Sequence, residues 1–240
     1  MIPEIYARIL ALARAIIKGH YVLNSGKHTC TYVDKWQLYK HSDYLVPFCR
    51  DIIDHFTNVE PLLAKIDVIV GPAVGGIPLC TLLQLLMTEQ KKLVCKKAGI
   101  KYKPIYAAFA IKDFASGELK IQDGYRNLIR GKNVLVIDDV VSSGKSLTEV
   151  IHEVLRLKGN IVGAACMYNR GVQSAKSLSV PTLYACIDDM IFDYPAEACP
   201  LCQEGVPIST SLGHGAEYVK PKKARKMRQR KPKPFDKSIF

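Results

Sequence analysis

Residues 134–147 constrain the fold of this 240-residue chain more than any other segment. Four apolar residues, 134–137, predict a buried strand, and two adjacent carboxylates, Asp138 and Asp139, follow directly. A small turn rich in hydroxyl groups then leads into a predicted helix. Ligands of open α/β sheets bind beyond the carboxyl ends of the strands. The segment therefore predicts a sugar-phosphate site, in which the carboxylates bind ribose hydroxyls and the turn at the helix N-terminus binds a phosphate.

Other readings of these residues fit less well or stay open. A Walker-type loop needs a glycine where Asp139 stands, although Lys145 and Ser146 match its last two positions. A dinucleotide-binding fingerprint needs spaced glycines, and this turn contains only Gly144. An ordinary strand–loop–helix crossover without a ligand is the remaining alternative.

The rest of the chain alternates apolar strands with helical patterns, which predicts an α/β fold with a doubly wound, mostly parallel sheet. The expected strands are 21–23, 29–33, 66–70, 93–95, 105–111, 134–137, 161–168 and 182–187. The expected helices are 3–18, 43–57, 145–158, 173–178 and one that ends near 86. Residues 113–124 are polar and glycine-punctuated, and are expected to form an exposed loop.

The net charge of +12 is concentrated at the C-terminus. Residues 219–240 hold ten Lys or Arg and one Asp, or +9, which leaves +3 for residues 1–218. The composition favours a solvated, disordered tail, with weak, sequence-independent binding to nucleic acid as the alternative. No apolar run reaches the roughly 18–20 residues of a membrane span. The N-terminus lacks a signal-peptide pattern, and scattered cysteines predict a reducing, cytoplasmic compartment.

The 134–147 segment resembles the signature of the type I phosphoribosyltransferases, which bind phosphoribosyl pyrophosphate (PRPP). An earlier glycine loop, 71–76, resembles the pyrophosphate loop of the same family. The resemblance implies that the two aspartates bind the ribose and that the following turn binds the 5-phosphate. The residues implied to contact PRPP are Ala73, Val74, Gly75, Gly76, Asp138, Asp139, Val140, Val141, Ser142, Ser143, Gly144, Lys145 and Ser146.

Two further motifs narrow the resemblance to the orotate phosphoribosyltransferases. The segment 25–35 resembles their serine–glycine turn and the strand that borders the base. Arg170 follows a predicted strand, and a guanidinium suits the carboxylate of orotate in bidentate geometry. The residues implied to contact orotate are Lys27, Tyr32, Val33, Ser142 and Arg170.

This resemblance implies a pentosyltransferase that moves the 5-phosphoribosyl group from PRPP to orotate, giving orotidine 5′-phosphate and pyrophosphate in pyrimidine biosynthesis. It implies Mg²⁺ as cofactor, a homodimer, and catalytic roles for Asp138, Asp139 and the loop lysine Lys112, with Arg126 as a second candidate. Specificity for another nucleobase is one alternative. A non-catalytic phosphoribosyl-binding module, regulatory or RNA-binding, is the other.

The chain departs from the family at two cation positions. Asn24 and Gly75 stand where many orotate enzymes have lysine. The loss of these cations is compatible with slower turnover, with a different anion, or with cations from another segment.

A Cys-x-x-Cys pair, Cys199 and Cys202, has the spacing of a zinc site. No second such pair exists, and the nearest further ligands along the chain are His214 and Cys186. The sequence therefore favours a plain turn with two thiols over a zinc site. Three regions are expected: a phosphoribosyltransferase domain with a small N-terminal hood (1–187), an extension carrying Cys-x-x-Cys and Gly-His-Gly (188–218), and the basic tail (219–240).

Overall fold

A computed structural model describes residues 2–171 and 173–220. The chain divides into two compact units, and each is described by itself. Of the described residues, the first unit contains 2–16, 33–171 and 173–191, and the second contains 17–32 and 192–220. The second unit thus combines an N-terminal segment with the residues that follow 191. The basic tail, for which nucleic-acid binding was the alternative prediction, lies almost wholly outside the described residues.

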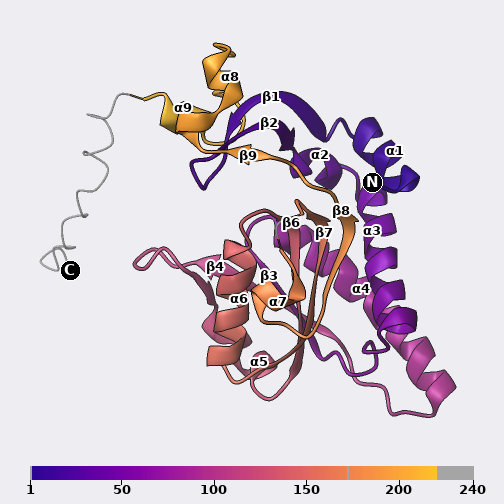
Figure 1. Ribbon diagram of the computed structural model, residues 1–240. Coiled ribbons are helices and arrows are strands. Elements are labelled where there is room, and N and C mark those ends of the chain that lie inside the picture. Colours follow the sequence, from indigo (N-terminus) through magenta and orange to yellow (C-terminus); the bar gives the residue numbers. More distant parts are fainter. Residues whose placement is uncertain (1, 172, 221–240) are drawn as a thin grey trace, which may run out of the picture. The chain divides into compact units, whose positions relative to one another are not determined.

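The first unit is built on a six-stranded sheet with the order β5-β4-β3-β6-β7-β8 (Figure 1). The strands are β3 (Val68–Pro72), β4 (Tyr106–Lys112), β5 (Leu119–Ile121), β6 (Asn133–Val141), β7 (Asn160–Asn169) and β8 (Leu183–Asp188). β5 pairs antiparallel with β4, and the other neighbours pair in parallel. The predicted mostly parallel α/β sheet is therefore confirmed.

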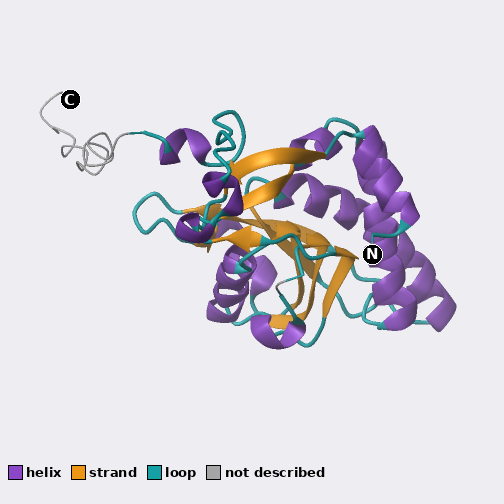
Figure 2. Ribbon diagram, turned by 45° about the horizontal axis from the view of Figure 1, so that its top comes forward, coloured by secondary structure: helices purple, strands orange, loops and turns teal. Residues whose placement is uncertain are grey.

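Alternating side chains of the strands make two cores, one on each face of the sheet. Leu135 and Ile137 pack with the helices α1, α3 and α4, whereas Val134 and Val136 pack with α6. Both faces are buried, which explains why these strands are continuous apolar runs. Helices flank the sheet on both sides in Figure 2. The helices are α1 (Glu4–Leu12), α2 (Lys35–Tyr39), α3 (Ser42–Asp54), the π-helical η1 (His55–Val59), α4 (Gly76–Ala98), the 3₁₀ turn η2 (Asp123–Tyr125), α5 (Arg126–Ile129), α6 (Lys145–Arg156) and α7 (Ala175–Leu178).

Two predicted elements are wrong. The helix expected over 3–18 ends at Leu12, and residues from Ile16 join strand β1 (Ile16–Val22). Arg14 has a left-handed backbone (φ 52°), which an α-helix cannot continue through. The strand expected over 93–95 lies in α4, where Cys95 continues the buried i, i+4 row of Met87 and Lys91. A short apolar run cannot distinguish a strand from the end of a long helix.

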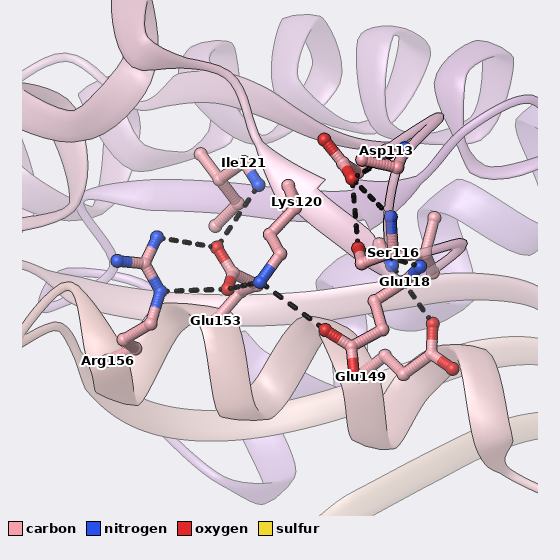
Figure 3. A network of polar contacts seen from close by, with 10 residues as sticks. Asp113, Ser116, Glu118, Lys120, Ile121, Glu149, Glu153 and Arg156 are labelled. Atoms are coloured by element: carbon pink, nitrogen blue, oxygen red, sulfur yellow. Dashed lines mark hydrogen bonds and ion pairs between the residues drawn. The ribbon is translucent and has the colours of Figure 1, made fainter.

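The expected loop over 113–124 contains a strand, because Leu119–Ile121 form β5. Asp113 closes the turn by accepting hydrogen bonds from the N–H groups of Ala115 and Ser116. Beyond the turn, Glu153 of α6 binds β5: it accepts a hydrogen bond from the N–H of Ile121 and lies 3.7 Å from Lys120 Nζ. Figure 3 shows this network, which anchors the outer strand to a helix.

Glu153→Gln is expected to lower the free energy of unfolding by about 1–3 kcal/mol at pH 7, because a buried acceptor loses its charge and part of its pairing. Arg156, with hydrogen bonds of 2.8 and 2.9 Å, lowers the pKa of Glu153 below its usual 4.5. This contribution is therefore fully present above pH 4.5 and is lost as the pH falls through the folded-state pKa. Urea denaturation at pH 7 and pH 3 should show a difference between wild type and variant that shrinks in acid.

Glu89→Gln is the matched control. Glu89 pairs with Lys92 at 2.9 Å, but both side chains are at least half exposed, so a change of roughly 0–1 kcal/mol is expected. Equal losses for the two variants would contradict the role of Glu153.

The second unit contains a three-stranded sheet with the order β1-β2-β9. Its further elements are β2 (His28–Val33), β9 (Asp193–Tyr194), the 3₁₀ turn η3 (Ala196–Ala198), α8 (Pro200–Gln203) and α9 (Gly215–Tyr218). The C-terminal segment runs along β1, where the N–H of His214 donates to the carbonyl of Val22 at 2.8 Å. Across all residues that the structure describes, no helix has the length and apolar character needed to span a membrane.

Candidate active site

The predicted PRPP-binding residues of the first unit gather at one edge of its sheet. β3, β4, β6 and β7 run in parallel, so their carboxyl ends meet at the same edge. The 71–76 loop starts in the last two residues of β3, and Lys112 ends β4. Asp138 and Asp139 lie near the end of β6, and Arg170 follows β7. Segments spread over about a hundred residues of sequence thus end at the same edge of the sheet.

The two strand-end carboxylates are almost fully buried. Asp138 is 6% exposed and Asp139 is 1% exposed. Backbone N–H groups bind both of them: Asp139 donates to the Asp138 carboxylate at 2.8 Å, and Val140 donates to the Asp139 carboxylate at 2.6 Å. Burial, and then the charge of Asp139, raise the pKa of Asp138 well above its usual range. Such a pair favours a neighbouring cation or hydroxyl groups that donate to it.

Two residues of α2 complete the environment of Asp139. Lys35 Nζ lies 2.8 Å from Asp139 Oδ2, and the Tyr39 hydroxyl lies 2.8 Å from the same oxygen. The Tyr39 hydroxyl is also 2.6 Å from the carbonyl oxygen of Gly75, so its single proton can be donated to either acceptor. Burial, and then the charge of Asp139, raise the pKa of Tyr39, which keeps the hydroxyl protonated.

Sequence reasoning assigned no role to Lys35 or Tyr39, although a signal was available. The two residues are four positions apart, which places them on one face of a helix. Asp34 marks the start of that helix, because its side chain accepts a hydrogen bond from the N–H of Trp36 at 3.2 Å.

The glycine loop after β3 approaches the carboxylates closely at Gly75. A Cβ atom on residue 75 would lie 2.1 Å from Asp139 Oδ2 and 2.3 Å from Lys35 Nζ. The absence of a side chain at this position therefore leaves room for Lys35. A cation from another segment, Lys35, thus lies beside the backbone of Gly75.

The turn after β6 has the geometry of an anion site. Gly144 precedes α6 with φ 73°, and a Cβ atom there would lie 2.8 Å from the Gln173 side chain. Ser143, Lys145 and Ser146 are exposed, and Ser142 is partly exposed. The first N–H groups of an α-helix lack partners within the helix and carry a positive partial charge. The turn therefore presents N–H and hydroxyl donors together.

The structure separates the two candidate loop cations. Lys112 is exposed at the end of β4, at the edge described above. Arg126 begins α5, after the antiparallel β5 has turned back from that edge, and pairs with Asp123 at 2.7 Å. Arg170 is 3% exposed, and its backbone N–H donates to the carbonyl of Val141 at 2.9 Å, which ties the end of β7 to that of β6.

Two of the implied orotate contacts, Lys27 and Tyr32, belong to the second unit. Lys27 is exposed at the turn between β1 and β2, and Tyr32 packs its ring 5.3 Å from that of Tyr21. Val33 ends β2 and falls in the first unit. Their contacts with a base stay predictions.

The further ligands expected for Cys199 and Cys202 are corrected by the structure. His214 is exposed and lies 3.4 Å from the Glu217 carboxylate, and Cys186 belongs to the first unit, where its thiol donates to the carbonyl of Phe48. The ligand atoms beside the cysteine pair come from His20 and His28. Neither histidine is close to the pair in sequence, so spacing could not identify them.

Comparisons with known proteins identify the family of the chain. The family model of the phosphoribosyl transferase domain matches residues 60–193. An orotate phosphoribosyltransferase of Thermoanaerobacter sp. (strain X514) is 33% identical over 208 residues, which cover 87% of this chain and 96% of that protein. An orotate phosphoribosyltransferase of Caldanaerobacter subterraneus subsp. tengcongensis is 31% identical with the same coverage.

Solved structures share the fold at lower identity. The crystal structure of orotate phosphoribosyltransferase from Aeropyrum pernix has a TM-score of 0.57 and 20% identity, covering 75% of this chain and 92% of that one. An adenine phosphoribosyltransferase structure has a TM-score of 0.53 and 18% identity, covering 75% of this chain and 99% of that one. The chain therefore belongs to the phosphoribosyltransferase family, and its sequence relatives place it with the orotate phosphoribosyltransferases.

Proposed function

We propose that the chain transfers the 5-phosphoribosyl group from PRPP to orotate and releases pyrophosphate. The observation that carries this proposal is the buried pair of carboxylates at the end of β6, with Lys35 and the Gly75 loop beside Asp139. Orotate as the acceptor is supported by the two relatives named orotate phosphoribosyltransferase.

The chain's residues act on this substrate mainly by positioning it. Asp138 and Asp139 accept hydrogen bonds from the ribose hydroxyls, and the N–H groups of the turn 142–146 bind the 5-phosphate. These contacts hold C1 of the ribose in place while its bond to pyrophosphate breaks and a ring nitrogen of orotate bonds to it, losing its proton to solvent. Lys35 stabilises the negative charge that grows on the departing diphosphate, because it lies beside the Gly75 loop.

Magnesium fits the donor set at this edge of the sheet. Asp138 and Asp139 offer hard carboxylate oxygens, the ligands that Mg²⁺ prefers. When bound, the ion would supply positive charge to the pyrophosphate and ribose oxygens. Lys35 already neutralises one of the two carboxylates at 2.8 Å.

Other implied roles are part of the same proposal. Arg170 binds the carboxylate of orotate with its planar guanidinium, and Ser142, Lys27, Tyr32 and Val33 border the base. Lys112, at the end of β4, contacts the leaving pyrophosphate. Formation of a homodimer also stays a prediction.

An acceptor panel tests the proposal. The full chain is supplied with PRPP and Mg²⁺ and, in separate reactions, with orotate, adenine, hypoxanthine or uracil, and nucleotide formation is followed by chromatography. Orotidine 5′-phosphate should form much faster than any other nucleotide. Preferential use of another base, or no nucleotide from any base, would overturn it.

Lys35→Ala is expected to reduce kcat/KM for PRPP by roughly 10²–10³-fold, the range for loss of one group that stabilises transition-state charge. The variant also leaves the buried Asp139 without its ion pair. Steady-state kinetics with PRPP varied would measure the loss. Lys40→Ala is the control, because Lys40 is exposed and its Nζ lies 2.6 Å from the Gln37 side chain. Similar kinetics for both variants would contradict the role given to Lys35.

A further inference from the structure

Two histidines and two cysteines of the second unit converge on one point. His20 lies on β1, His28 begins β2, Cys199 directly precedes α8, and Cys202 lies within α8. Each offers one ligand atom, and the four atoms lie within 4.8 Å of one another. We propose that these four residues bind a structural zinc ion.

Three nitrogen–sulfur distances in this cluster are close to those of a tetrahedral zinc site. His20 Nε2 lies 3.5 Å from Cys199 Sγ and 3.7 Å from Cys202 Sγ, and His28 Nδ1 lies 3.4 Å from Cys202 Sγ. Zinc bonds of about 2.3 Å to sulfur and about 2.0–2.1 Å to nitrogen place such nitrogen and sulfur atoms about 3.6 Å apart. The two nitrogens are 2.9 Å apart and would have to separate by about 0.4 Å to match the same tetrahedron.

A hydrogen bond orients the His20 ring so that one of its nitrogens can bind a metal ion. Its Nδ1 lies 2.7 Å from the carbonyl oxygen of Val206, which can only accept a hydrogen bond. The proton of a neutral His20 is thereby assigned to Nδ1, which leaves the lone pair of Nε2 directed at the cluster. A backbone carbonyl that orients a metal-binding imidazole in this way is a common second layer of zinc sites.

The polar contacts of the His28 ring are made at the same cluster. Its side chain is fully buried, and its ring meets Tyr218 edge-on at 4.9 Å. Within residues 2–171 and 173–220, Nε2 has no hydrogen-bond partner, so Nδ1 makes the polar contacts of this ring.

The ligand types select zinc and a structural role. Two thiolates balance the charge of a divalent ion, which matters because His20, His28 and Cys199 are buried. A tetrahedral set of two nitrogens and two sulfurs is typical of zinc. Four protein ligands leave no open position for a substrate, so the ion would stabilise structure. Cys202 is exposed and provides a path for the metal.

A metal site would give the second unit stability that its small apolar core does not provide. Among the residues that the structure describes, both hydrophobic core clusters consist of residues of the first unit. The second unit joins the hairpin of β1 and β2 to a segment more than 160 residues later in the sequence. A metal bound by both segments supplies stability that so small an apolar core cannot.

Metal analysis of the full chain, purified without added metal and without a histidine tag, tests the proposal. About one zinc per chain is expected. Cys199→Ser, Cys202→Ser, His20→Asn and His28→Asn should each lose most of the bound zinc. Cys30→Ser, on the same hairpin, and His214→Asn are matched controls that should keep it.

Measurements on the wild-type chain keep the proposal falsifiable if the ligand variants fail to fold. A thiol-modifying mercurial should release zinc to a colorimetric indicator, and Co²⁺ added to the metal-free chain should give the visible spectrum of a tetrahedral thiolate complex. Absence of zinc together with no such cobalt spectrum would overturn the site. So would a disulfide between Cys199 and Cys202 in the freshly purified chain, or full zinc content in both cysteine variants. Zinc content is independent of orotidylate formation, so either proposal can fail alone.

Discussion

Asp139→Asn should reduce kcat/KM for PRPP by roughly 10²–10³-fold or more while the chain stays folded. Asparagine has nearly the same shape as aspartate but no charge, so the ion pair with Lys35 at 2.8 Å is lost. The amide also replaces one acceptor oxygen with a donor, which faces the Lys35 ammonium in one orientation and the N–H of Val140 in the other. Steady-state kinetics would measure the loss, and circular dichroism with thermal unfolding would verify the fold.

Asp123→Asn serves as the matched control for this substitution. Asp123 pairs with Arg126 at 2.7 Å, but its side chain is 84% exposed and lies outside the candidate site. Its kinetics should equal those of the wild type. A folded Asp139→Asn chain with unchanged kcat/KM would refute the assignment of the ribose site.

Gly75→Ala should reduce kcat/KM for PRPP by roughly 10–100-fold, since small displacements of positioning groups cost rates of this order. The added Cβ atom would lie 2.1 Å from Asp139 Oδ2 and 2.3 Å from Lys35 Nζ. The end of the lysine side chain can move away, but the Asp139 carboxylate is buried and bonded to the N–H of Val140. The substitution must therefore displace the carboxylate, the loop or both.

Gly124→Ala is a control for the loss of a glycine. No atom lies within 4 Å of a Cβ atom placed on residue 124, and its backbone is outside the left-handed region. This variant should have wild-type kinetics. Equal activity of the two variants would show that the close approach at Gly75 has no catalytic consequence.

The sequence predicts correctly those parts of the fold in which one residue pattern favours a single kind of element. Strand β6 and its carboxylates were predictable because four apolar residues followed by two acids allow few arrangements other than a buried strand end. The extent of α4 was harder to predict from the sequence, because Val94 and its neighbours suit a strand as well as a helix. The start of β1 at Ile16 depends on the backbone of Arg14, which local composition does not reveal.

Contacts between distant segments account for what sequence reasoning missed in the candidate sites. Lys35 reaches Asp139 across a hundred residues of chain, and His20 reaches Cys199 across nearly 180. Neither pair has a spacing that identifies it, because the fold creates the proximity. The absence of a lysine at Gly75 was visible in the sequence, but the presence of Lys35 beside it depends on the position of α2.

Phosphorus NMR of PRPP mixed with the full chain and Mg²⁺, with and without orotate, tests the proposed reaction most directly. Pyrophosphate and orotidine 5′-phosphate should appear in equal amounts as PRPP is consumed, and only when orotate is present. PRPP that persists in the presence of orotate, or that decays to ribose 5-phosphate at the same rate without it, would contradict an orotate phosphoribosyltransferase.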